Sequence, residues 1–215
     1  MNKDLSTKEE EVKWEICRAM GVLYSRGLIS ATEGNISARM PEAGEFWITP
    51  SGLFKGGLIV DKLIKVDFEG NILEGSEKPS IETPMHRAIY KTRPEVNAIV
   101  HAHNPVTVGL ALAGIAIQPV TVGAAVTLGK VSVIPFILPG TEDLAKAVAR
   151  HIAGAKVLIL QNHGVVAVGS NIIEAEAIVE TLEEVATAEW VAYHFGKPSL
   201  ITEEDIKRMR KLYKA

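Results

Sequence analysis

Apolar residues near the N-terminus recur at helical spacing. Val12, Ile16, Met20 and Leu23 follow one another every three or four positions, so they predict a helix over residues 7–27 with one apolar face. Capping residues, glycines and prolines mark the starts and stops of further helices. These predicted helices cover residues 80–93, 105–113, 141–154, 172–195 and 203–213.

Short apolar runs bounded by turn residues predict strands between these helices. The run around Phe46 is followed by a predicted hairpin whose turn is formed by Glu69, Gly70 and Asn71. The last two strands are joined by a turn that contains His163. The predicted strands lie within residues 45–52, 63–75, 96–103 and 155–169.

Helices and strands alternate along the chain, and no repeat, low-complexity segment or linker divides it. Residues 115–137 mix apolar pieces with glycine and proline, so we expect irregular structure there. The alternation predicts the α/β class, with one domain over residues 1–215. This alternation does not determine the order of the strands in the sheet.

The composition excludes several classes of function but adds little about the fold. With 215 residues, of which 47% are hydrophobic, the chain can bury one substantial core. The net charge of −3 gives no basic surface for nucleic acid. The single cysteine, Cys17, excludes a disulfide within the chain and is expected to be a small buried hydrophobe. Without a leader-like or membrane-spanning apolar run, we expect no membrane contact and a cytoplasmic location.

Two histidines interrupt the apolar run AIVHAHNPVT. Alternate residues of a strand share a face, so His101 and His103 point to the same side. A third histidine, His163, follows a later apolar strand and precedes Gly164. Three imidazoles with one open position form the catalytic type of zinc site. The alternative is that His163 is only a turn residue.

Other polar residues extend this candidate site. Glu82 stands near the start of a predicted helix, where it could be a metal ligand or a general base, or merely favour the helix dipole. His86 is four positions later on the same face and is a possible competing ligand. On their helical patterns, His86, His151 and His194 are expected to be surface or packing residues.

Two segments have the composition of an anion cradle, in which hydroxyls, an amide and glycine N–H groups surround a negative charge. The segment SATEGNIS offers Thr32, Gly34, Asn35 and Ser37, and the segment ITPSG offers Thr49, Ser51 and Gly52. Neither is a P-loop, because the chain lacks that motif. Taken singly, each segment could be an ordinary turn.

In order along the chain, EGNIS, ITPSG, KPSIE, AIVHAHN and LQNHG resemble the class II aldolase/adducin-like family. The resemblance implies one α/β domain with a central, mainly antiparallel sheet between helical layers. It also implies a homotetramer with active sites at subunit interfaces. The implied reaction is cleavage of a ketose 1-phosphate, such as L-fuculose 1-phosphate, into dihydroxyacetone phosphate and lactaldehyde.

The resemblance also assigns roles to residues. One divalent ion per subunit, Zn²⁺ or else Co²⁺ or Mn²⁺, would sit on His101, His103 and His163. Glu82 would be the catalytic acid/base and could touch the metal. For that role its pKa should lie closer to neutral than that of a free glutamate. The positions that match the family's phosphate site are Thr32, Asn35, Ser51, Gly52 and Ser80.

The sequence departs from the family pattern at two places. Ile81 stands where family aldolases often have a second serine, so one phosphate hydroxyl is missing. The tyrosine that protonates the leaving aldehyde has no counterpart, and the matching position is near Thr121. Tyr213 resembles a second family tyrosine that reaches the neighbouring site, so we expect it to be a proton donor or a substrate cover.

These departures leave other reactions open. Pentulose-phosphate 4-epimerases and methylthioribulose-1-phosphate dehydratases of the same family stabilise a similar anion. A non-enzymatic adducin-like interaction domain would be expected to lose the metal ligands, which are all present here. A zinc hydrolase outside the family would use three histidines and a carboxylate too, but the two anion cradles and the order of the motifs argue against it.

Overall fold

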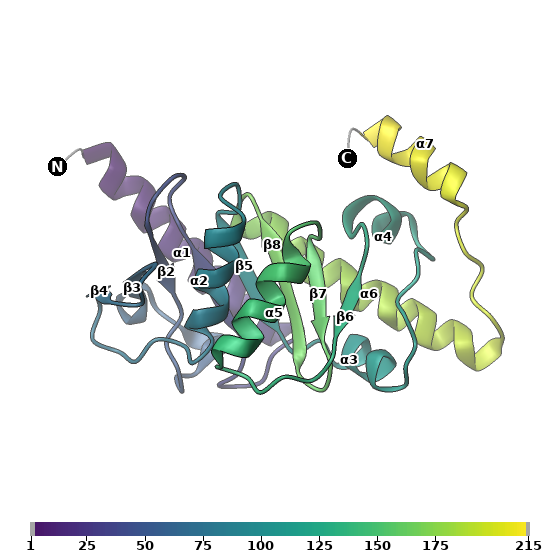
Figure 1. Cartoon of the computed structure of the whole chain (residues 1–215), viewed down its shortest axis with the longest axis horizontal. Coiled ribbons are helices and arrows are strands. Elements are labelled where there is room, and N and C mark those ends of the chain that lie inside the picture. Colours follow the sequence, from purple (N-terminus) through teal and green to yellow (C-terminus); the bar gives the residue numbers. More distant parts are fainter. Residues whose placement is uncertain (1–2, 214–215) are drawn as a thin grey trace.

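The computed structural model describes residues 3–213, and its centre is a single sheet (Figure 1). Within that range the sheet has eight strands in the order β4-β3-β2-β1-β5-β8-β7-β6. Their bounds are β1 Asn35–Ala38, β2 Glu45–Ile48, β3 Ile64–Asp67, β4 Ile72–Glu74, β5 Ala98–Ala102, β6 Ser132–Ile134, β7 Val157–Leu160 and β8 Gly164–Gly169.

The described strands pair antiparallel except for β6 and β7, which run parallel. Strand β5 lies near the middle, where it pairs with β1 on one side and β8 on the other. His101 is opposite Asn35 on β1 and Val166 on β8. The predicted α/β class with a mainly antiparallel sheet is therefore confirmed.

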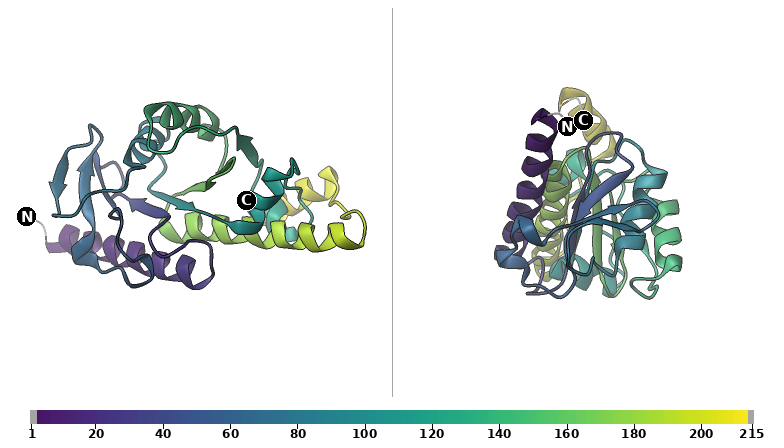
Figure 2. Two further views of the ribbon diagram at one scale, coloured as in Figure 1. Left: turned by 90° about the horizontal axis from the view of Figure 1, so that it is seen from below. Right: turned by 90° about the vertical axis from the view of Figure 1, so that its left-hand side faces the viewer.

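Helices cover both faces of the sheet, as Figure 2 shows from below. Helices α1 (Lys3–Ser25) and α6 (Ile172–Phe195) lie on one face, and α2 (Thr83–Thr92) and α5 (Glu142–Ile152) lie on the other. The predicted sheet between helical layers is thus confirmed.

Each face of the sheet has its own apolar core. Along β5, Ala98, Val100 and Ala102 pack with α1 and α6, whereas Ile99 packs with α2 and α5. This alternation is the expected period of a strand buried on both faces. His101 shares the parity of Ile99, so it belongs to the face covered by α2.

Three described helices stand at the β6 side of the sheet or beyond it. Helix α3 (Pro105–Leu112) follows β5, and α4 (Val122–Thr127) precedes β6. Helix α7 (Glu203–Tyr213) returns from the far end of α6 and packs beside α4 (Figure 1). None of the helices in the described range has the length and apolarity needed to cross a bilayer.

The predicted elements needed several corrections. Residues 115–137 are not all irregular, because they contain α4 and β6. The six and three residues of these elements are too short for a clear period. The first helix begins at Lys3 rather than residue 7 and ends at Ser25. Gly27 then adopts a φ of +69°, which confirms the predicted glycine stop.

Candidate metal and anion site

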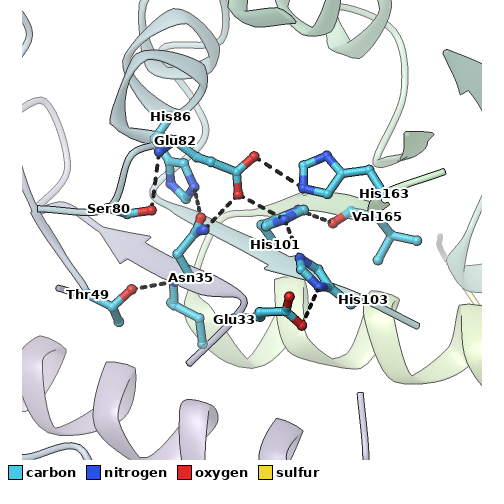
Figure 3. A network of polar contacts seen from close by, with 11 residues as sticks. Glu33, Asn35, Thr49, Ser80, Glu82, His86, His101, His103, His163 and Val165 are labelled. Carbon is cyan, nitrogen blue, oxygen red and sulfur yellow. Dashed lines mark hydrogen bonds and ion pairs between the residues drawn. The ribbon is translucent and has the colours of Figure 1, made fainter. Parts of the chain in front are cut away.

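Three histidine rings meet at one end of the sheet (Figure 3). His101 is in β5, His103 directly follows it, and His163 is in the turn between β7 and β8. One nitrogen from each ring lies within 4.8 Å of the others. The pairing of β5 with β8 brings the third ring to the first two, which are distant from it in the sequence.

Hydrogen bonds orient two of these rings. The Nδ1–H of His101 donates to the carbonyl oxygen of Val165 at 2.8 Å. The Nδ1 of His103 lies 3.2 Å from a carboxylate oxygen of Glu33, to which its N–H donates. The Nε2 atoms of both rings are turned toward the same point and are 3.1 Å apart. Such outer partners fix the tautomer of metal-binding histidines.

The third ring reaches the site because Gly164 has no side chain. A Cβ there would overlap the carbonyl oxygen of Ala102 and lie only 3.0 Å from the His103 ring. The residue before His163, Asn162, adopts a φ of 62°, a conformation that asparagine tolerates in tight turns. The Nδ1 of His163 is buried and finds no hydrogen-bond partner among the described residues.

Glu82 lies at the start of α2 and faces the imidazoles. Its Oε2 is 2.9 Å from His101 Nε2 and accepts a hydrogen bond from Asn35 Nδ2, also at 2.9 Å. Its Oε1 is 3.5 Å from His163 Nε2 and is a buried atom without a hydrogen bond. The side chain makes no capping bond to α2, so it is aimed into the site rather than at its own helix.

The charges of the site shift the protonation of these groups. Burial alone would raise the pKa of Glu82, but the charge and hydrogen bond of His101 outweigh it, so the pKa lies below its ordinary value. This differs from the expected shift toward neutrality. Burial and the charge of His101 lower the pKa of His163 to about 4. The ring of His163 is therefore neutral and able to bind a metal at physiological pH.

A series of buried hydrogen bonds leads from the aromatic core to Glu82, and Figure 3 shows its last part, from His86 through Asn35. Tyr90 donates to Ser37 Oγ at 2.8 Å, and Ser37 donates to His86 Nδ1 at 2.6 Å. The Nε2–H of His86 donates to Asn35 Oδ1 at 2.6 Å. His86 is fully buried, so the expected packing role is correct, but it packs against the site and is not one of the clustered histidines.

A cleft of about 300 Å³ opens beside the histidines and is lined by four of the predicted anion-binding residues. Gly52 follows one of them, Ser51, with a φ of +72° and does not itself line the cleft. Thr49 is buried, and its hydroxyl accepts the N–H of Ile36. The four lining residues are Thr32, Asn35, Ser51 and Ser80.

Two predicted residues do not reach the cleft of their own chain. Tyr213 ends α7 beside α4, and 59% of its surface is exposed. Thr121 caps α4, where its hydroxyl accepts the N–H of Ala124 at 3.2 Å. Neither residue lines the described cleft. A contribution from Tyr213 therefore requires the neighbouring subunit that the family resemblance implies.

The structure adds roles that the sequence analysis did not assign. Glu33 orients His103, and Lys55 is buried against the two anion loops. His86 was recognisable only as the residue one helical turn after Glu82. No sequence signal marks Lys55, because it lies among glycines after ITPSG without a motif of its own.

The donor set fits a divalent ion. Two histidines already have the orientation that a bound metal needs, and a third ring and a carboxylate converge on them. Glu82 Oε1 is buried without a hydrogen-bond partner among the described residues and lies 3.5 Å from His163 Nε2. Buried polar atoms of this kind are normally satisfied, so a missing partner is consistent with an ion-binding role. Three nitrogens and one oxygen suit zinc.

Comparisons with known proteins agree with this geometry. The family model described as Class II Aldolase and Adducin N-terminal domain matches residues 14–190. A 3-oxo-tetronate 4-phosphate decarboxylase of Haemophilus influenzae is 38% identical, over 76% of this chain and 79% of that protein. An L-fuculose phosphate aldolase of Methanocaldococcus jannaschii is 34% identical, over 80% and 90%.

Solved structures lead to the same family. A structure of an L-fuculose 1-phosphate aldolase superposes with a TM-score of 0.88 at 32% identity, and covers 95% of this chain and 97% of its own. The matched family model spans most of the chain, including all three clustered histidines. The chain therefore belongs to the class II aldolase and adducin family.

Proposed function

We propose that this protein is a divalent-metal-dependent aldolase that cleaves a ketose 1-phosphate, such as L-fuculose 1-phosphate, into dihydroxyacetone phosphate and lactaldehyde. One observation carries the proposal: three convergent imidazoles and a buried carboxylate stand at one end of a cleft that is lined by the hydroxyl residues Thr32, Ser51 and Ser80. His101, His103 and His163 would hold the ion, with Glu82 beside them. Zinc is the ion we expect, and Co²⁺ or Mn²⁺ would suit the same ligands.

The reaction breaks the bond between C3 and C4 of the sugar phosphate. The C4 hydroxyl gives its proton to solvent as the aldehyde forms, the bonding electrons remain on the dihydroxyacetone phosphate half as an enediolate, and C3 of that half then takes up one proton. A divalent ion in this site would supply Lewis-acid stabilisation of that negative charge, worth several kcal/mol.

Glu82 is the group placed to move a proton at carbon. It would protonate C3 of the enediolate in the cleavage direction and remove the same proton in the reverse direction. Asn35 holds Oε2 of Glu82, so Oε1 is the oxygen left for proton transfer. The ordinary state of Glu82 in this structure is the carboxylate, which is the form required to abstract the proton.

The phosphate group serves to position the substrate. Thr32, Ser51 and Ser80 line the cleft on the side of the two anion loops, so a phosphate bound there would fix the distance to the reacting carbon. Orientation of this kind can supply roughly 7–11 kcal/mol of a barrier.

A second reaction is favoured by the relative from Haemophilus influenzae. A 3-oxo-tetronate 4-phosphate that loses C1 as carbon dioxide leaves the same enediolate of dihydroxyacetone phosphate. This reaction releases no aldehyde, so it needs no tyrosine near Thr121 to exchange a proton with the C4 oxygen, and this chain has none there. Decarboxylation is therefore our second candidate function.

One set of assays separates the candidates. The zinc-loaded protein is incubated with dihydroxyacetone phosphate plus lactaldehyde or glycolaldehyde, and in parallel with 3-oxo-tetronate 4-phosphate. Formation of a ketose 1-phosphate supports the aldolase, whereas release of carbon dioxide without aldol condensation supports the decarboxylase. Epimerisation of a pentulose phosphate, or loss of water from methylthioribulose 1-phosphate, with neither of these activities would overturn both.

We also propose that the active form is a homotetramer. Large apolar side chains are exposed near the end of α6, where Trp190 is 49% and Phe195 is 89% exposed. An apolar groove between α3 and α6 contains Trp190. Exposed patches of this kind mark interaction sites. Light scattering after size exclusion tests the proposal, and a monomer at working concentration would contradict it.

A further inference from the structure

Lys55 is a buried cation that the proposed chemistry does not use. It opens a short 3-10 helix after the ITPSG segment, and only 1% of its surface is exposed. Lysine is almost never buried this fully without a charged partner. Within residues 3–213, however, no carboxylate forms an ion pair with Lys55, and its ammonium group donates to one neutral acceptor, the carbonyl oxygen of Pro50.

The position of Lys55 connects the two anion loops. Its backbone N–H donates to the carbonyl oxygen of Ala31 at 2.8 Å, which ties it to the loop that carries Thr32. Its ammonium group contacts Pro50, the residue before Ser51 in the other loop. Lys55 lines the same cleft as Thr32 and Ser51. The positive charge therefore lies where the two loops meet.

The electrostatics leave this charge uncompensated. Burial lowers the pKa of Lys55 to about 8, so the group is still mainly charged at neutral pH. An ammonium group has three N–H donors, and one is used. A buried, partly satisfied cation is costly, whereas the same cation beside an anion makes a strong, charge-assisted hydrogen bond.

We propose that the Lys55 ammonium group binds the phosphate of the substrate, as the charged member of the cradle formed by Thr32, Ser51 and Ser80. This inference rests on the proposed function, because it assumes a phosphate monoester in the cleft. It also explains how the site tolerates Ile81, which is 56% exposed and lines the cleft without a hydroxyl. The ammonium group offers the donors that a second serine would have offered.

Two substitutions at Lys55 remove the charge in different ways. Lys55→Met keeps the length and removes both the charge and the hydrogen bond to Pro50. Lys55→Gln removes the charge but can still donate to Pro50, so it preserves the local fold. Lys146→Met is the matched control, because Lys146 is an exposed lysine of α5 that lies away from the cleft and has no ion-pair partner within the described residues.

The primary measurement is calorimetric titration of the full-length, zinc-loaded protein and its variants with inorganic phosphate, with acetate as a carboxylate probe. Both Lys55 variants should bind phosphate about 10- to 100-fold more weakly than the wild type, and Lys146→Met should bind it normally. Acetate should bind weakly to all four proteins. Thermal melts should show Lys55→Met folded and no less stable than the wild type, because it loses an uncompensated buried charge.

The inference is overturned if folded Lys55→Gln binds phosphate as tightly as the wild type, or if Lys146→Met loses as much affinity. Lys55→Gln decides the question if Lys55→Met does not fold. Phosphate binding that depends on Lys55 without lyase turnover would leave the inference standing and remove the proposed function. Lyase turnover together with phosphate binding that does not depend on Lys55 would overturn the inference and leave the proposed function standing.

Discussion

His86 donates its Nε2–H to the side-chain oxygen of Asn35 across 2.6 Å, although 51 positions separate the two residues in the chain. This bond fixes which end of the Asn35 amide faces Glu82, because the amide oxygen is already occupied. The amide nitrogen is then left to donate to Glu82 Oε2. His86 is thus a positioning residue for Glu82 and acts through Asn35.

Loss of one imidazole ligand should release the metal. We expect His103→Ala to lower zinc affinity and to abolish lyase turnover, because two histidines and a carboxylate remain from a set of four. Metal content after dialysis, measured by atomic emission, and turnover measured on the same sample check this. His151→Ala, on the outer helix α5, is the control and should change neither. Full metal content with normal turnover in the His103 variant would remove His103 from the site.

Loss of the Glu82 carboxylate should reduce the turnover rate more than it reduces the affinity for the metal. Glu82→Gln keeps the shape of the side chain and one acceptor oxygen for Asn35, but an amide cannot act as a general acid or base at neutral pH. We expect zinc to remain bound while kcat falls about 10²- to 10⁴-fold, the range for loss of a general acid/base. Exchange of the dihydroxyacetone phosphate C3 proton with deuterium should slow in parallel. An unchanged exchange rate would exclude Glu82 from proton transfer at this carbon.

The hydrogen bonds that connect His86 to Glu82 through Asn35 should affect kcat. His86→Leu removes the bond that orients Asn35, so we expect kcat to fall about 10- to 100-fold, as for other outer-shell partners, with little change in KM. His86→Gln can donate and accept at similar positions and should recover part of the loss. A purely structural role predicts instead that both variants lose stability and keep the kcat of the folded fraction.

Burial of His86 should also make stability depend on pH. Burial, together with the charge of His101, outweighs the opposite effect of Glu82 and lowers the pKa of His86 to about 3, against an ordinary value of 6.5. The unfolded chain therefore binds this proton first as the pH falls. The stabilising contribution of neutral His86 is complete above pH 6.5 and is lost between there and pH 3.

From pH 7 to pH 5, this linkage amounts to about 2 kcal/mol of unfolding free energy. Urea titrations at both pH values, in a chelator so that metal release does not contribute, measure it. The wild type should lose about 2 kcal/mol more than His86→Leu over this interval. Equal losses in the two proteins would mean that His86 is protonated in the folded state.

The sequence alone determined the local elements and one half of the metal site. The period of two in the β5 segment places His101 and His103 on one side whatever the strand order, since parity is a property of the backbone. Glycine and proline positions determined where helices stop, as at Gly27. Five motifs in family order were enough to indicate the fold and its chemistry.

Only the tertiary structure decided which distant residues meet. The pairing of β5 with β8 brings His163 to the other histidines, and the packing of α2 aims Glu82 at them. The burial of Lys55 and the bond from His86 to Asn35 are likewise products of long-range packing. Local patterns carry no signal for such contacts, because their free energy comes from surfaces that become adjacent only once the sheet has assembled.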